Sequence, residues 1–313
     1  MIKNRNGDTG KWRHGDTSPI HRFTDSPNRL FFNRVTIIGV GLIGGSFALA
    51  LKKNRLCNKV IGYGRSLENL QRAKEKAIID SFELDPAKAC DGSDLILFAI
   101  PVGSFIDIAK KIRGSLNRGA IVTDVGSVKG KLVRDMETLM PEGVYFVGGH
   151  PIAGSNHSGI DTATADIFKG AKCIITPTEN TDQTAIEIVI AIWKAFGSIV
   201  KLINPDEHDR IYASVSHLPH LIAYMIMNTV ADIDNSYLKF SGQGFMDTTR
   251  IASSSPELWR DICILNKDNL LESIEIFKNN LDRVSQYLRA LDSESLERDF
   301  KKARTLREGI GQN

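Results

Sequence analysis

Three glycines between a short apolar run and a helical pattern constrain the fold of this chain most. The sequence RVTIIGVGLIGGS, starting at Arg34, sets Gly39, Gly41 and Gly44 in a G-x-G-x-x-G arrangement. The apolar run predicts a strand, and residues 42–54 predict the helix that follows it. The first glycine permits a tight turn, the second lets backbone approach a pyrophosphate, and the third lets helix and strand pack closely. The motif in this setting predicts a dinucleotide site at the helix N-terminus.

The order of strand, turn and helix recurs through the first two thirds of the chain. Further apolar runs occupy residues 59–64, 94–101, 120–126, 144–149 and 171–177. Their hydrophobicity is continuous rather than alternating, which indicates strands covered on both faces of a mainly parallel sheet. We therefore expect an α/β fold with an N-terminal Rossmann-type, doubly wound domain.

The pattern changes at Asn204–Pro205, after which it stays helical to about Arg307. We expect a disordered leader at 1–33, a dinucleotide-binding domain at 34–204, an all-α domain at 205–308 and a short tail at 309–313. The helical domain is apolar enough to be expected to bury its surface against a second copy, giving a homodimer.

The charge and hydrophobicity of the chain argue against nucleic-acid binding, membrane insertion and secretion. The formal charge is +3, and residues 1–33 carry all of it, because the remaining chain has 34 residues of each sign. A neutral body does not favour nucleic-acid binding, and no apolar stretch reaches the roughly 20 residues that span a bilayer. The first 30 residues lack the apolar core of a secretory signal.

The four cysteines are scattered along the chain without metal-ligand spacing: Cys57, Cys90, Cys173 and Cys263. This pattern indicates reduced thiols in a cytoplasmic protein.

The end of the second strand bears on the choice of dinucleotide. An acid that binds the adenosine ribose is expected there, but the sequence has Gly64, Arg65 and Ser66, with Ser66 also a plausible cap of the next helix. A guanidinium without a neighbouring acid favours acceptance of NADP, and the alternative is a solvated Arg65 in an NAD enzyme. The remaining residues expected to bind the cofactor are Leu42, Ile43 and Pro101.

Two turns at the carboxyl edge of the sheet carry candidate catalytic residues. The first is GGHPIAGSNHSG, residues 148–159, which has little helix or strand character. The strand before it should place His150 at the ligand-binding edge of the sheet. An imidazole there can accept a proton from a hydroxyl. In DVGSVKGK, a strand ends at Asp124, and Ser127 is either a helix cap or a contact of the substrate or histidine. Lys129 is expected to face solvent.

The helical domain offers candidate substrate ligands. His217 and His220 in SVSHLPHLIAY are three residues apart and share a face in a helix, which Pro219 should kink. A metal pair is disfavoured because no third ligand has suitable spacing, so we expect no metal. Arg250 in GQGFMDTTRIA could clamp a carboxylate, or could be an ordinary surface arginine.

Taken together, these stretches resemble the prephenate/arogenate dehydrogenase family of tyrosine biosynthesis. The resemblance covers about residues 34–305 and rests on VTIIGVGLIGGS, DVGSVKGK, GGHPIAGS, PDEHDRIYASVSHLPH and GFMDTTRIASSSPELWRDI in this order. It implies a Rossmann domain, a helical dimerisation domain, and oxidative decarboxylation of prephenate or arogenate with hydride transfer to NAD(P)+.

The resemblance also implies roles for single residues. His150 would accept the proton of the ring hydroxyl, and Ser127 would hold His150 or that hydroxyl. Arg250 would bind the ring carboxylate. The residues implied to line the substrate pocket are His217, His220, Asp247 and Trp259.

The chain departs from the family pattern at three places. Ser155-Asn156-His157 replaces the Ser/Thr-Glu-Lys of many members, Met246 replaces a lysine found in some, and Gly64-Arg65 replaces the aspartate of NAD-type members. Two other interpretations remain open. One is a β-hydroxyacid type of dehydrogenase, although its lysine motif is missing, and the other is a non-catalytic dinucleotide-sensing protein.

Overall fold

The computed structural model describes residues 31–154 and 159–310, which form two compact units that divide between His208 and Asp209. The expected domain boundary at Asn204–Pro205 falls at the beginning of the helix that contains this division. Residues 1–30 of the expected leader and 311–313 of the tail lie outside the described residues. Phe32 and Asn33, which the sequence assigned to the leader, belong instead to the first strand.

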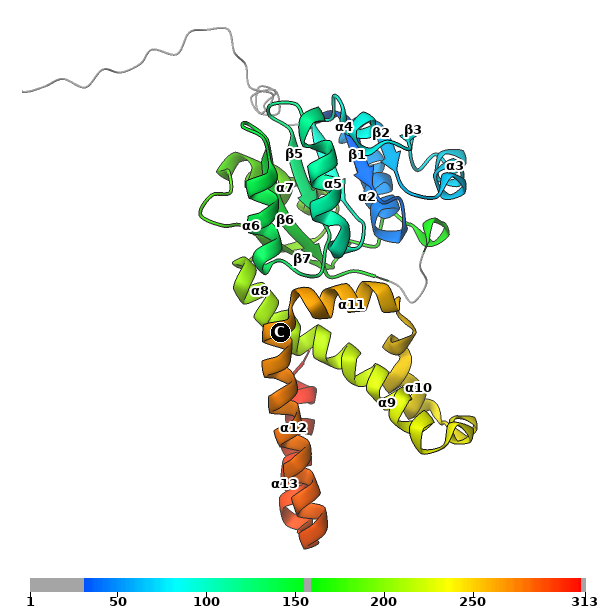
Figure 1. Ribbon diagram of the computed structural model, residues 1–313, viewed down its shortest axis with the longest axis vertical. Helices are drawn as coiled ribbons and strands as arrows, with labels where there is room; N and C mark the ends of the chain where they lie inside the picture. The colour runs from blue at the N-terminus through cyan, green and yellow to red at the C-terminus, as the bar shows by residue number, and fades with distance from the viewer. Residues whose placement is uncertain (1–30, 155–158, 311–313) are drawn as a thin grey trace, which may run out of the picture. The chain divides into compact units, whose positions relative to one another are not determined.

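The first unit is built on an eight-stranded sheet in the order β3-β2-β1-β4-β5-β6-β7-β8 (Figure 1). All neighbouring strands are parallel except β6 and β7. The strands are β1 Phe32–Ile38, β2 Cys57–Tyr63, β3 Ser81–Glu83, β4 Leu95–Phe98, β5 Ile121–Asp124, β6 Tyr145–Pro151, β7 Lys172–Thr176 and β8 Ile199–Leu202. The expected doubly wound, mainly parallel sheet is confirmed.

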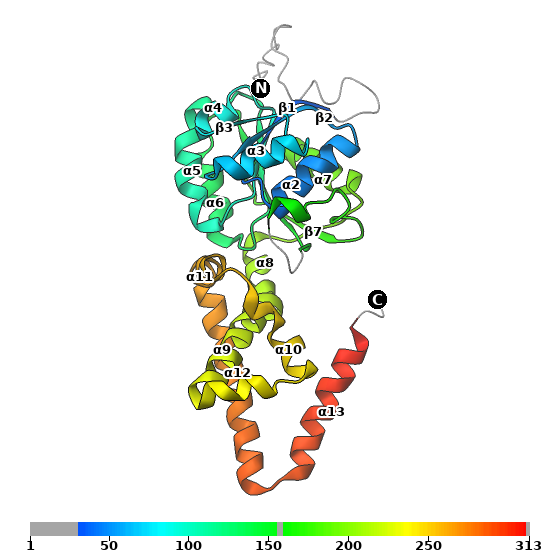
Figure 2. The same cartoon turned by 90° about the vertical axis from the view of Figure 1, so that its right-hand side faces the viewer.

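Helices cover both faces of this sheet, as the continuous hydrophobicity of the strands requires (Figure 2). The helices are α2 Leu42–Lys53, α3 Leu67–Glu75, α4 Pro86–Cys90, α5 Phe105–Ile112, α6 Gly130–Leu139 and α7 Gln183–Ala195. Phe47 of α2 meets Trp193 of α7 edge to face at 5.4 Å between ring centroids, and Phe168 and Phe196 complete this aromatic cluster. On the other face, Phe98 of β4 contacts Phe105 of α5.

The second unit contains helices and no strand within the residues that are described. Helix α8, Pro205–Tyr212, continues through a π-helical turn at Ala213–His217 into α9, Leu218–Asp234. Pro219 lies in the first turn of α9, directly after the π-helical turn, so the irregularity expected beside this proline takes the form of a π-turn in the preceding residues. The other helices are α10 Gln243–Thr249, α11 Pro256–Leu265, α12 Lys267–Ala290 and α13 Ser293–Gly309.

Helices α12 and α13 form a hairpin (Figure 2), and several of its large apolar side chains are exposed. The chain reverses at Leu291, which has a left-handed φ of 54°, and Arg283 forms an ion pair with Asp299 at 3.0 Å. Exposed large apolar side chains along the hairpin are Leu271, Ile276, Leu281, Leu288, Phe300 and Leu306. Within residues 31–154 and 159–310, no helix combines the length and hydrophobicity that a membrane crossing requires.

Candidate active site

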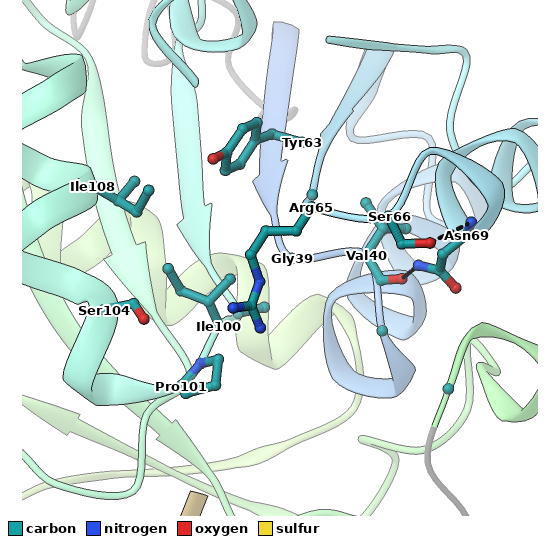
Figure 3. Close-up of a pocket in the computed structure, with 14 residues that line it drawn as sticks. Gly39, Val40, Tyr63, Arg65, Ser66, Asn69, Ile100, Pro101, Ser104 and Ile108 are labelled. Atoms are coloured by element: carbon teal, nitrogen blue, oxygen red, sulfur yellow. Dashed lines mark hydrogen bonds between the residues drawn. The ribbon is translucent and has the colours of Figure 1, made fainter. Parts of the chain in front are cut away.

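A cavity of about 540 Å³ opens at the carboxyl ends of β1, β2 and β4, where the strand order of the sheet reverses (Figure 3). This is the position at which open α/β sheets bind their ligands. Six of the residues expected to bind the cofactor line it: Gly39, Gly41, Gly64, Arg65, Ser66 and Pro101. Leu42, Ile43 and Gly44 are not among the lining residues and belong to the first turn of α2.

The geometry of the three glycines fits a bound dinucleotide. Gly39 has φ +100°, and a Cβ there would lie 2.4 Å from the carbonyl oxygen of Ala99. A Cβ on Gly44 would lie 2.1 Å from the carbonyl oxygen of Gly39, so α2 packs directly on the end of β1. A Cβ on Gly41 would meet nothing within 4 Å, and no side chain caps α2 at this residue. The helix N-terminus therefore presents its N–H groups to a space that a pyrophosphate can enter.

The adenosine side of the cavity carries a positive charge. None of the described residues that line it is acidic, and Figure 3 shows the guanidinium of Arg65 extending over the cavity toward Ile100 and Pro101. Ser66 caps α3 as expected, because its hydroxyl accepts a hydrogen bond from the Asn69 N–H at 3.2 Å. The Asn69 side chain donates to the carbonyl of Val40 at 2.7 Å and ties α3 to the glycine turn. Asn69 was missed by the sequence reasoning, since its partner lies 29 residues away.

His150 belongs to strand β6, although the glycine-rich sequence around it predicted little regular structure. It pairs with Ile174 of the antiparallel β7, and it is 8% exposed. The glycines permit this close packing: a Cβ on Gly148 would lie 2.4 Å from Thr176 Oγ1, and one on Gly149 would lie 2.8 Å from the Asp124 carbonyl oxygen. The strand thus carries the imidazole to the carboxyl edge of the sheet.

Asp124, at the end of β5, fixes the backbone beside both predicted catalytic residues. The Gly149 N–H, directly before His150, donates to Asp124 Oδ1 at 2.9 Å. The Gly126 N–H, directly before Ser127, donates to Asp124 Oδ2 at 2.8 Å. One buried carboxylate therefore holds the His150 strand and the Ser127 loop at the same edge of the sheet.

The prediction that Lys129 faces solvent was wrong. Its side chain is 1% exposed, and its ammonium forms an ion pair with the equally buried Asp124. Burial raises the pKa of the Asp124 carboxyl, whereas Lys129 and the two backbone N–H donors act in the opposite direction. Helix α6 begins at Gly130 with Lys129 as its N-cap, so Ser127 does not cap it. Ser127 is half-buried in the loop between Asp124 and this helix.

In the second unit, Trp259 of α11 brings the two predicted histidines together. His220 stacks on Trp259 at 3.6 Å between ring centroids, and His217 meets it edge to face at 6.0 Å. The His220 Nδ1–H donates to the Ser216 carbonyl at 2.8 Å. Burial and, to a smaller extent, the charge of Arg250 lower the pKa of His220. His217 is buried on the π-helical turn, and its Nδ1 lies 3.1 Å from Asn266 Nδ2.

Arg250 lines a second cavity, of about 640 Å³, that lies within the helical unit. Tyr224, Phe245 and Met246 are among the other residues that line this cavity, and Arg250 itself is exposed. Asp247 is not among the lining residues; its carboxylate accepts a hydrogen bond from Gln243 at 2.8 Å on the exposed side of α10. Ser155, Asn156 and His157, one of the departures from the family pattern, lie outside the described residues. Within the described part of the chain, no group of three metal-ligating side chains occurs.

Comparison with known proteins identifies the family. The model "Prephenate dehydrogenase, nucleotide-binding domain" matches residues 47–202, and "Prephenate dehydrogenase, dimerization domain" matches residues 204–302. The chain belongs to the prephenate dehydrogenase family. The family expected from the sequence motifs is thereby confirmed.

Individual relatives extend over most of the chain. The prephenate dehydrogenase of Bacillus subtilis is 35% identical over 88% of this chain and 76% of its own length. The cyclohexadienyl dehydrogenase of Zymomonas mobilis is 31% identical over 88% of this chain and 95% of its own length. The solved prephenate dehydrogenase of Aquifex aeolicus, in complex with hydroxyphenyl propionate and NAD+, has a TM-score of 0.84 at 38% identity and covers 89% of this chain and 98% of its own. Synechocystis arogenate dehydrogenase has a TM-score of 0.73 at 28% identity, over 88% and 99% of the two chains.

Proposed function

We propose that this chain catalyses the oxidative decarboxylation of prephenate to 4-hydroxyphenylpyruvate, with transfer of a hydride to NAD(P)+. The observation that carries the proposal is the hydrogen bond from the Gly149 N–H to the buried Asp124 carboxylate. This bond holds His150 at the sheet edge that also forms the dinucleotide cavity. The relatives named prephenate and cyclohexadienyl dehydrogenase support the same reaction.

The residues divide the chemistry between them. Bound NAD(P)+ supplies the hydride acceptor. His150 accepts a hydrogen bond from the ring hydroxyl and takes its proton as the C–H bond of the same carbon gives up a hydride. The ring carboxylate then leaves as CO2, and its bonding electron pair aromatises the ring. The phenol oxygen recovers a proton, so the reaction releases no net proton. Ser127, at the same edge, orients either the hydroxyl or the imidazole.

Arg250 is proposed to bind the ring carboxylate, and His217, His220 and Trp259 to contact the substrate side chain. A guanidinium is suited to this role because it offers paired donors to a carboxylate. Asp247 is proposed at the edge of the same site.

We further propose that NADP+ is accepted as well as NAD+, and that the enzyme is a homodimer formed through its helical domain. Arg65, and the lack of an acid among the described residues that line the cavity, support the first proposal. The dimerization-domain match and the exposed apolar side chains of α12 and α13 support the second. All four cysteines are free thiols, which supports a cytoplasmic location.

Nicotinamide reduction by the purified protein tests these proposals. The four reactions pair prephenate or arogenate with NAD+ or NADP+, and turnover with prephenate is expected for both dinucleotides. Turnover with arogenate but not with prephenate would show that the substrate is arogenate and would overturn the proposal of prephenate. A folded protein that binds dinucleotide but is inactive in all four reactions would overturn the catalytic function.

A further inference from the structure

The imidazole of His208 lies against the proposed base. His208 is on α8, belongs to the same compact unit as His150, and is fully buried. Its Nε2 lies 2.9 Å from His150 Nδ1, and the two rings meet at 62° with centroids 5.1 Å apart. The rings are therefore joined by a hydrogen bond rather than by stacking.

A hydrogen bond between two ring nitrogens contains one proton, so it couples the tautomers of the two neutral rings. If the proton is on His208 Nε2, His150 accepts at Nδ1 and carries its own proton on Nε2. If the proton is on His150 Nδ1, then His150 Nε2 is unprotonated and acts as an acceptor. A neutral imidazole can accept a proton at only one of its two nitrogens, and the partner of the other nitrogen decides which one.

We propose that His208 is a positioning residue that accepts the Nδ1–H of His150 and thereby keeps the His150 Nε2 lone pair available for the substrate hydroxyl. This inference rests on the proposed function of His150 as the base. When His150 takes the substrate proton, its Nδ1–H bond to His208 becomes charge-assisted and stabilises the imidazolium. A neutral acceptor does so without adding a second charge to the buried pair.

Two substitutions separate this role from simple packing. His208→Gln can set its amide oxygen near the position of Nε2 and retain an acceptor, whereas His208→Leu has similar bulk and no acceptor. We expect kcat to fall roughly 10²-fold in His208→Leu, within the about 10²–10⁴-fold contribution of a positioned base, and to recover at least tenfold in His208→Gln. The KM for prephenate and the Kd for dinucleotide should stay within about twofold.

The controls address folding and stability. His208→Asn is polar, but its side chain is one bond too short to reach His150, so its kcat should fall as far as that of His208→Leu. It therefore replaces His208→Leu in the comparison if the leucine variant does not fold. Thr36→Val removes a buried hydroxyl that donates to Ala89 O at 2.7 Å, in the middle of β1. It should lower stability and leave kcat unchanged. Equal kcat in the glutamine and asparagine variants would overturn the positioning role.

A direct reading of the tautomer makes the inference independent of turnover. Nitrogen NMR of ¹⁵N-histidine-labelled protein, with His150 assigned by comparison with His150→Asn, should find neutral His150 protonated at Nδ1 in the wild type. The leucine or asparagine variant should gain the Nε2–H form. Protonation at Nε2 in the wild type would refute the proposal even in an active enzyme. A Nδ1–H ring in a protein without turnover would support the pairing and refute the proposed function.

Discussion

Substitution of Lys129 by methionine tests whether the buried ion pair holds the active-site edge together. Both Lys129 and Asp124 are 1% exposed, so solvent does not screen the pair. Removing one partner of a buried ion pair typically costs about 3–5 kcal/mol, against a total stability of about 5–15 kcal/mol. Asp124 can neutralise itself by taking up a proton, so we expect a loss of about 3 kcal/mol in the free energy of unfolding at neutral pH.

The pH dependence of this loss follows from the pKa of Asp124. Burial raises this pKa, and the charge and hydrogen bond of Lys129 lower it. The variant keeps the burial and loses both contributions of Lys129, so the folded-state pKa rises further above the unfolded value of about 3.9. The folded variant then binds this proton more tightly than the unfolded chain does. Its stability is highest below about pH 4 and falls as the pH rises toward the folded-state pKa.

Urea unfolding monitored by far-ultraviolet circular dichroism measures the effect between pH 4 and pH 8. The difference between wild type and Lys129→Met should be smallest at pH 4 and largest near neutrality. Lys131→Met is the matched control, since Lys131 lies on α6, is 84% exposed and pairs with Asp135; it should cost less than about 0.5 kcal/mol. A loss below about 1 kcal/mol in Lys129→Met, or a loss that grows toward low pH, would refute the reasoning.

Four further predictions concern single residues. His150→Asn should retain the fold and dinucleotide binding but lose roughly 10²–10⁴-fold in kcat; near-normal turnover would exclude His150 as the base. Arg250→Ala should raise the KM for prephenate, because the variant loses a charge-assisted contact with the ring carboxylate. An unchanged KM in steady-state kinetics would show that Arg250 does not bind the substrate. Gly41→Ala should weaken dinucleotide binding by calorimetry without lowering the melting temperature, because its Cβ meets no protein atom within 4 Å; unchanged affinity would contradict the pyrophosphate site. Arg65→Ala should weaken NADP+ more than NAD+, and equal losses would exclude contact with the 2′-phosphate.

Much of the fold could be predicted because local patterns determine it. The glycines of residues 39–44 and the continuous apolar strands indicate a doubly wound sheet without any long-range information. The carboxyl edge followed from the strand order, so the location of His150 at that edge was predictable from the run VYFVGG. The shared face of His217 and His220 was predictable from helical spacing, and both contact Trp259.

The residues that were missed depend on partners far apart in sequence or on burial. His208 lies 58 residues from His150, and nothing in PDEHDR indicates that its ring faces another histidine. Lys129 was expected in solvent because lysine is rarely buried, and only the position of Asp124 beneath the loop makes burial possible. An irregularity beside Pro219 was expected, but its π-helical form at residues 213–217 has no simple sequence signal.

The most direct test of the central claim is the stoichiometry of prephenate turnover with the ring carboxylate isotopically labelled. Our account predicts one labelled CO2 and one molecule of 4-hydroxyphenylpyruvate for each nicotinamide reduced. Reduction of nicotinamide with the label retained in the organic product, or release of CO2 without reduction, would contradict it.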